Sequence, residues 1–225
     1  MKQKIITILA LLMSINMALF AQENTPNPNL PAVQNPPVSA EVTAGHRTWC
    51  FQTVMSKNLQ SAPKFGFASV TNMQVAWGTQ SIKDYMVQAH ATFDFVKNFS
   101  VGLGFHWNPI EGVRPSAQLA YAYGTPVWLI STNLRTDLNG DPNTGWFLLT
   151  EFRPKIAQQW HLYLRWQSLA SMMPKRGTHA RSYIYLRCGV TWKDLTFGAA
   201  ANLDWYGNDT FHRNNFGGFV AVTLF

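Results

Sequence analysis

Along most of the chain after residue 38, apolar and polar side chains alternate with a period of two. The pattern is clearest at residues 195–206, where the apolar face carries Leu195, Phe197, Ala199, Ala201, Leu203 and Trp205. The same alternation recurs at residues 99–107, 160–167 and 182–192. Successive side chains of a β-strand point to opposite faces, so this period predicts strands rather than helices.

Segments of this kind, separated by residues typical of turns, continue through the body of the chain. The predicted strands are 47–55, 65–77, 84–95, 99–107, 115–123, 127–138, 146–153, 160–170, 182–192, 195–206 and 216–225. Residues 38–46 can supply a further strand, paired with 47–55. Because bacterial single-chain barrels have an even number of strands, we predict an all-β, transmembrane, antiparallel up-and-down β-barrel of about 12 strands. The alternative is about 10 strands, with the residues before 50 partly outside the wall.

The connections between the predicted strands favour a barrel in the bacterial outer membrane. Read from the C-terminus, a long connection at 207–214 is followed by a tight one at 193–194, and a long one at 171–181 by a moderate one at 154–159. Long loops at one rim and short turns at the other are typical of such barrels. Tryptophans lie at or near the predicted strand ends, at Trp77, Trp107, Trp128, Trp146, Trp160, Trp166, Trp192 and Trp205. Tryptophan favours the membrane–water interface, because its ring is apolar and its N–H needs a polar partner.

Composition narrows the classes of protein that remain. Hydrophobic residues make up 47% of the chain and aromatic residues 14%, but charged residues only 13%, about half of their share in an average soluble domain. This excludes a disordered chain and argues against an ordinary cytosolic enzyme. The mean hydropathy of −0.09 argues against a helical membrane protein. A soluble β-sandwich is an alternative, although it would bury its aromatic residues and expose more charge.

The first residues have the pattern of a secretory signal peptide. Lys2 and Lys4 precede an apolar stretch at 5–20, and Ala21 provides a small residue for cleavage. We predict a signal peptide at 1–21, a flexible Pro- and Asn-rich leader at 22–37 and the barrel at 38–225. The predicted localisation is the cell outer membrane. A transmembrane anchor is the alternative for the first segment.

Several segments resemble those of small outer-membrane β-barrels of Gram-negative bacteria, and more closely those of uncharacterised barrels of Bacteroidetes type. These segments are WFLLTEFRPK (146–155), WHLYLRWQ (160–167), RSYIYLRCGV (181–190), FGAAANLDWYGND (197–209) and NFGGFVAVTLF (215–225). The resemblance implies the fold and the membrane, and it carries no activity or functional residue. The last strand, ending in Phe225, resembles the signal that the outer-membrane assembly machinery recognises. The expected partners are this machinery and outer-membrane lipid, with no nucleic acid.

In the predicted barrel the polar phase of each strand faces the lumen. The polar candidates for its lining are His90, Asp94, His106, Arg135, Glu151, Arg153, Arg165, Arg187, Asn202 and Asp204. A charge in a narrow lumen needs a partner or water, so we expect Glu151 to lie near Arg165. For the same reason we expect Arg187 to lie near Asp204. These residues can form a network of salt bridges and hydrogen bonds that fills the bore, or a selectivity lining for a small polar or anionic solute. The sequence therefore indicates an outer-membrane barrel whose specific role it does not identify, with a narrow pore as one function and a non-conducting structural or interaction barrel with a plugged lumen as the alternative.

No recognisable catalytic motif joins the available histidines and serines, among them His90, His106, Ser100 and Ser116. The sequence contains neither GxSxG nor HExxH. We therefore predict a protein that is not an enzyme, with no catalytic residues, no metal site and no cofactor. An outer-membrane lipid-modifying hydrolase is the less favoured alternative.

The two cysteines, Cys50 and Cys188, lie in predicted strands far apart in the sequence. An exported chain can join two cysteines in a disulfide, but Cys188 falls on the apolar phase of its strand. The sequence leaves open one disulfide or two free thiols that face lipid or the core.

Overall fold

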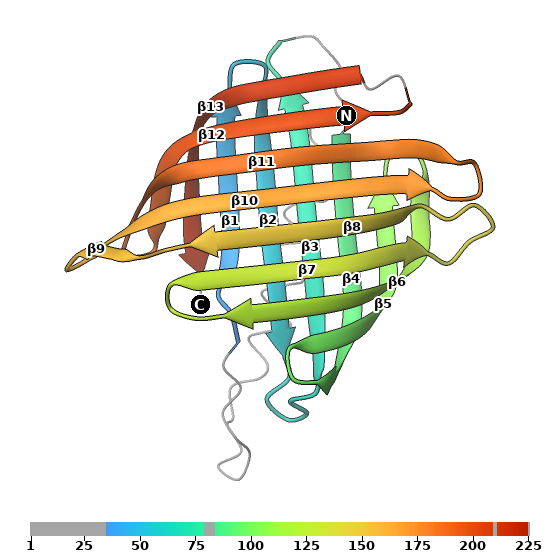
Figure 1. Cartoon of the computed structure of the whole chain (residues 1–225), viewed down its shortest axis with the longest axis horizontal. Coiled ribbons are helices and arrows are strands. Elements are labelled where there is room, and N and C mark those ends of the chain that lie inside the picture. Colours follow the sequence, from blue (N-terminus) through green and yellow to red (C-terminus); the bar gives the residue numbers. More distant parts are fainter. Residues whose placement is uncertain (1–34, 79–83, 209–210, 225) are drawn as a thin grey trace.

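The computed structural model describes residues 35–78, 84–208 and 211–224 (Figure 1). The signal peptide predicted at 1–21, most of the leader predicted at 22–37, and Phe225 lie outside these ranges. Within them, no helix is long and apolar enough to cross a membrane.

Extended strands make up almost all of the described chain. They are β1 (Val38–Gly45), β2 (Thr48–Asn58), β3 (Phe65–Ala76), β4 (Asp84–Val96), β5 (Phe99–Asn108), β6 (Gly112–Gly124), β7 (Trp128–Asp137), β8 (Thr144–Phe152), β9 (Lys155–Ala157), β10 (Trp160–Met173), β11 (Thr178–Trp192), β12 (Leu195–Tyr206) and β13 (Phe211–Leu224). Each long strand pairs with its two neighbours in an antiparallel register. The short β9 pairs only with β10, at the edge that β8 leaves free.

The sheet closes on itself. Its order runs from β11 through β12, β13 and β1 to β8 and β10, and β10 then pairs back onto β11. With β9 left aside, this is a closed antiparallel barrel of 12 strands. In Figure 1 strands β7 to β13 cross the front of the barrel, while β1 to β5 run behind them at a steep angle. The prediction of 12 strands is confirmed, and the alternatives of 10 strands and of an open β-sandwich are wrong.

The first strand decides the count. β1 pairs with β2 over Ser39–Ala44 and with β13 over Val38–Gly45, so it joins the two ends of the sheet. Its alternation is short but clear. Glu41 and Thr43 are buried in the barrel, whereas Val42 is 46% exposed on the outside.

Polar residues fill the inside of the barrel and apolar residues cover the outside. Arg187, Gln167 and Asp204 are at most 3% exposed, whereas Leu103 is 65% exposed in the middle of β5. Isolated soluble proteins rarely expose so much contiguous apolar surface. The distribution has the inverted alternation of a transmembrane barrel, in which lipid faces the apolar side chains.

Exposed tryptophans stand close to the strand ends. Trp77, Trp128, Trp160 and Trp192 are exposed at such positions, and Trp146 lies near the start of β8. Trp166 is also exposed but lies in the middle of β10, paired with Thr150 and Leu186, so its predicted place near an end is wrong. The aromatic belt is therefore present at the strand ends and extends inward at this one tryptophan.

The predicted contrast between long and short loops is weaker than the sequence indicated. β10 continues to Met173 and β11 begins at Thr178, so residues 174–177 alone connect them. β13 begins at Phe211, inside the connection predicted at 207–214. The strand ends here carry inward polar residues such as Ser171 and Arg181, and the apolar phase that marks a strand is lost there.

Two facing glycines let the wall bend where side chains pack inside. Gly189 and Gly198 are register partners, flanked in the same row by Tyr163 and Phe219. A Cβ on Gly189 would lie 2.1 Å from the backbone oxygen of Phe197. The rings of Tyr163 and Phe219, which flank the two glycines in this row, contact each other with centroids 5.9 Å apart.

The two cysteines lie on opposite faces of the wall. Cys50 is buried inside the barrel, and Cys188 is exposed on the outer face of β11. Both thiols are free. The disulfide alternative is therefore wrong.

Candidate functional site

The structure places the predicted lumen residues on the inner face of the wall to different depths. His90, His106, Arg135, Arg165, Arg187, Asn202 and Asp204 are buried. Asp94, Glu151 and Arg153 are half-buried. These residues do not form one cluster. Most of them belong to three groups of charges, whereas Asp94 accepts a hydrogen bond from Asn58 at 2.6 Å and His90 lies 2.9 Å from Ser116.

The first group is centred on Glu41 of β1. Arg187 donates hydrogen bonds from Nη2 and Nε to Glu41 Oε1, at 2.7 and 2.9 Å. Arg165 Nη2 lies 2.8 Å from Glu41 Oε2 as an ion pair, without the geometry of a hydrogen bond. Arg187 also donates to Asn202 Oδ1 at 2.8 Å. One carboxylate thus forms ion pairs with two guanidinium groups that are both buried.

The predicted partners within this group differ from those in the structure. Arg165 and Glu151 are register partners, as the strand order implies, but Arg165 forms its ion pair with Glu41. Glu151 instead accepts a hydrogen bond from Tyr163 at 2.8 Å and pairs with Arg153 at 3.6 Å. The side chains reach across the bore to more distant strands, which adjacency along the sheet cannot reveal.

The second group crosses the bore at one rim. The described residues at this rim are 46–47, 77–78, 109–111, 138–143, 174–177 and 207–208, and we call it the mouth rim. The chain enters β1 and leaves β13 at the opposite rim. Arg181 Nη1 lies 2.9 Å from Asp84 Oδ1. Arg181 belongs to β11 and Asp84 to β4, and five strands separate these two in either direction round the ring. The ion pair therefore spans the barrel between opposite walls.

Further contacts hold this bridge in place. Arg181 Nη2 pairs with Asp204 Oδ1 at 2.7 Å, and Tyr206 donates its hydroxyl hydrogen to Asp84. Asp204 also accepts a hydrogen bond from Tyr185 at 3.1 Å. The predicted pairing of Arg187 with Asp204 is wrong, because Arg181 occupies that carboxylate and Arg187 is held by Glu41.

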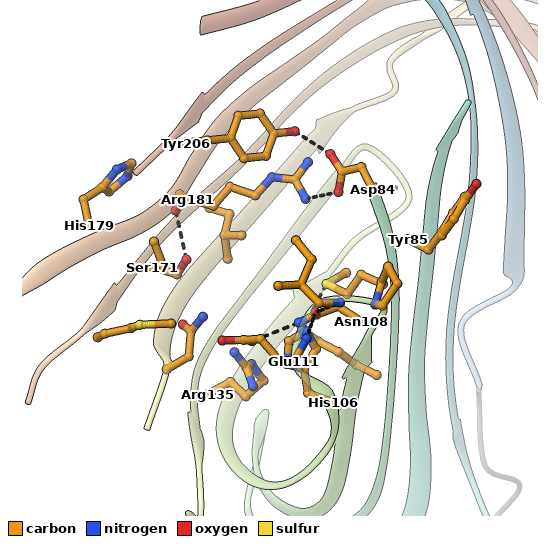
Figure 2. A pocket seen from close by; sticks show the side chains of 18 residues that line it. Asp84, Tyr85, His106, Asn108, Glu111, Arg135, Ser171, His179, Arg181 and Tyr206 are labelled. Atoms are coloured by element: carbon orange, nitrogen blue, oxygen red, sulfur yellow. Dashed lines mark hydrogen bonds and ion pairs between the residues drawn. The ribbon is translucent and has the colours of Figure 1, made fainter. Parts of the chain in front are cut away.

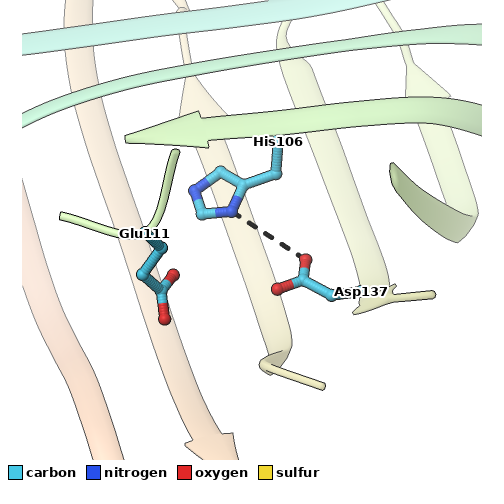
Figure 3. Close-up of side chains that lie close together, drawn as sticks. All are labelled: His106, Glu111 and Asp137. Carbon is cyan, nitrogen blue, oxygen red and sulfur yellow. Dashed lines mark ion pairs between the residues drawn. The ribbon is translucent and has the colours of Figure 1, made fainter. Parts of the chain in front are cut away.

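The third group lies on β5 to β7. Asp137 pairs with Arg135 and, at 3.5 Å, with Arg114, and Arg114 pairs with Glu111 at 3.2 Å. His106 Nδ1 lies 3.9 Å from Asp137 Oδ1 (Figure 3). His106, Glu111 and Asp137 each offer one atom that could bind a metal ion, and these three atoms lie within 4.8 Å of one another. The two guanidinium groups already neutralise both carboxylates, so the group has no excess negative charge to attract a cation.

A cavity of about 370 Å³ lies inside the mouth rim, between the second and third groups (Figure 2). Its wall includes Asp84, His106, Glu111, Arg135, Asn143 and Arg181. Figure 2 places Arg181, Asp84 and Tyr206 at one end of the cavity and Glu111, Asn108, Arg135 and His106 at the other. Its size is within the range of ~300–1,000 Å³ usual for small-molecule sites.

Three residues that hold the first two groups of charges together are not among those predicted from the sequence. Glu41 lies in the segment whose place in the wall was open, and Asp84 is the first residue of β4. Arg181 falls inside the connection predicted at 171–181, which is strand in the structure. In the sequence, only the alternation of polar Glu41 with apolar Ala40 and Val42 indicates that Glu41 faces the lumen.

Comparison with known proteins identifies no family for this chain. No protein-family description and no curated protein matches the chain. A solved structure described as the NanC porin is similar with a TM-score of 0.46 and 13% sequence identity, covering 84% of this chain and 99% of that one. The assignment of the barrel rests on the strand pairing described above.

Proposed function

We propose that this chain is a narrow outer-membrane channel for small polar solutes, of the Bacteroidetes type that its sequence resembles, and that it is not an enzyme. The observation that carries the proposal is a closed barrel with an apolar outer surface, a polar interior and a cavity inside one rim. Lipid would cover the outer surface, and solute would meet the polar interior. The signal peptide would export the chain, and the assembly machinery would recognise the strand that ends in Phe225.

The bore is narrow because side chains reach across it. A barrel of about eight strands is filled by its side chains, and one of about sixteen leaves an aqueous channel. In this barrel of 12 strands, the bridge between Arg181 and Asp84 divides the mouth. The cavity lies beside that bridge, so solute would enter there and pass when the bridge opens.

Single-channel conductance of the refolded full chain in a planar bilayer tests the proposal. Asp84→Asn removes the charge that holds Arg181 across the mouth, and we expect a larger unitary conductance than in the wild type. The matched control is Asp141→Asn, whose partner Arg176 is 61% exposed at the rim; we expect the wild-type conductance. Barrels that are folded by heat-modifiable gel migration but silent in all three forms would contradict a channel.

The contacts across the bore also favour the second candidate, a non-conducting barrel with a plugged lumen. Besides the bridge, Gln74 of β3 donates a hydrogen bond at 2.7 Å to Tyr185 of β11. A plug of this kind would act through the loops of the mouth rim. Silence of Asp84→Asn is the result that would favour this candidate over the channel.

One pair of residues bears on the hydrolase alternative. His90 Nε2 lies 2.9 Å from Ser116 Oγ, a distance that would suit a base and a nucleophile. However, Ser116 is 0% exposed and His90 is 2% exposed. A buried hydroxyl cannot reach an ester bond, so we do not propose a hydrolase.

A further inference from the structure

We propose that the mouth cavity is a recognition site for a neutral polyhydroxylated solute, a mono- or disaccharide, in preference to an anion. This inference rests on the proposed channel for its biological meaning, but the binding it describes can be measured without conductance. It is carried by three features of the cavity wall: the pairing of its charges, its unpartnered polar atoms and its apolar side chains.

The charged groups of the cavity form neutral pairs. Arg181 is held by Asp84, and Glu111 is held by Arg114 at 3.2 Å. Arg135 is held by Asp137. An anion beside one of these guanidinium groups would also meet the carboxylate that already neutralises it, and the two like charges would repel each other. The cavity therefore offers an anion little net attraction.

The same pairs suit hydroxyl groups. A hydroxyl carries one donor and two acceptor sites, so it can accept from a guanidinium and donate to the neighbouring carboxylate. The pair of Arg181 and Asp84 presents both kinds of group side by side on the wall, and Glu111 and Arg135 add an acceptor and a donor. A solute with several hydroxyls can use these groups without breaking the ion pairs.

Two buried polar atoms on the wall have no hydrogen-bond partner among the described residues. His106 Nδ1 and Asn143 Oδ1 make no hydrogen bond with another protein group, although His106 is 6% exposed and Asn143 is 9% exposed. Both residues line the cavity. A buried polar atom without a hydrogen-bond partner is costly. Both atoms are covered as they stand, so each side chain must turn toward the cavity before a solute hydroxyl can donate to it.

Apolar side chains complete the wall. Leu169 and Met173 of β10 and Met86 of β4 line the same cavity. Small-molecule sites combine such surfaces with a few polar groups that fix orientation. The C–H face of a sugar ring could pack on them while its hydroxyls meet the ion pairs.

Isothermal titration of the refolded full chain in detergent micelles tests the proposal. Glucose and glucuronate form a matched pair, because they differ by one carboxylate, and maltose extends the series. We expect saturable binding of glucose or maltose, and at least tenfold weaker binding of glucuronate. Tighter binding of glucuronate, or no saturable binding of either neutral sugar, would overturn the inference.

Asn143→Leu locates the site. It removes the unpartnered Oδ1 but keeps the backbone N–H of residue 143, which donates to Asp137. We expect sugar affinity to fall about tenfold, as for the loss of one hydrogen bond. The control, Asn133→Leu, makes the same change on β7 outside the cavity wall and should leave affinity unchanged. Equal loss in both variants would refute the assigned site.

The two proposals fail separately. A barrel that binds glucose or maltose but passes no current would contradict the channel and keep the recognition site. A barrel that conducts but binds glucuronate in preference would keep the channel and overturn the recognition site. If Asn143→Leu does not fold, the comparison of glucose with glucuronate on the wild type still decides the inference.

Discussion

Glu41→Gln is expected to destabilise the folded barrel far more than an ordinary loss of one charge. The Glu41 side chain is 3% exposed, and it forms ion pairs with Arg187 and Arg165, whose side chains are 1% and 4% exposed. Removing one partner of a buried ion pair costs about 3–5 kcal/mol, because the remaining charge is left without compensation. The glutamine amide can still accept one hydrogen bond, so we expect about 3 kcal/mol, or a change of about a hundredfold in the unfolding equilibrium.

Urea unfolding in lipid vesicles, followed by tryptophan fluorescence, measures this difference. Asp141→Asn removes one charge from an ion pair at the surface, where Arg176 is 61% exposed. Such a pair contributes about 0–1 kcal/mol. A Glu41→Gln variant within about 1 kcal/mol of the wild type would refute the reasoning. It would mean that water screens this part of the lumen as it screens the surface.

Three further predictions concern the wall. Leu103→Arg should cost about 2–4 kcal/mol of unfolding free energy, because Leu103 faces outward in the middle of β5. Val113→Arg, near the start of β6, should cost about 0–1 kcal/mol. Similar costs of the two substitutions in urea titrations would argue against a lipid-facing belt. Gly198→Ala should lower the folded fraction on heat-modifiable gels, because its Cβ would lie 2.3 Å from a backbone oxygen, whereas Gly140→Ala has open space; equal yields would contradict this. In vesicles, Cys188 should react with a lipid-soluble maleimide and resist a charged one; equal labelling would place it outside the membrane.

Period-two alternation predicted most of the wall because lipid outside and polar groups inside impose opposite demands on successive residues. Residues 195–206, where the alternation is clearest, form β12 with the predicted bounds. The alternation of apolar and polar residues is lost where a strand extends beyond the apolar belt, as at Arg181. Both faces of a strand can be polar there, so the period of two no longer marks the strand. The sequence therefore predicts a connection at 171–181, where the structure has the end of β10 and the start of β11.

The partners of the buried charges were not predictable in the same way. The sequence gives the neighbours of a strand, and it placed Arg165 beside Glu151 correctly. Ion pairs across the bore depend on how many strands close the ring and on how far each side chain reaches inward. Arg181 meets Asp84 only because their strands face each other in a barrel of 12 strands.

The seam between β1 and β13 constrains the order in which this barrel can form. Its register joins residues 38–45 to residues 217–224, so closure must wait until almost the whole chain has been made. Contacts between segments so distant in sequence are slow to form. Until then β1 has an unpaired edge, which is open to pairing with strands of other chains. A protein built in this way depends on being kept apart from its own copies until its last strand arrives.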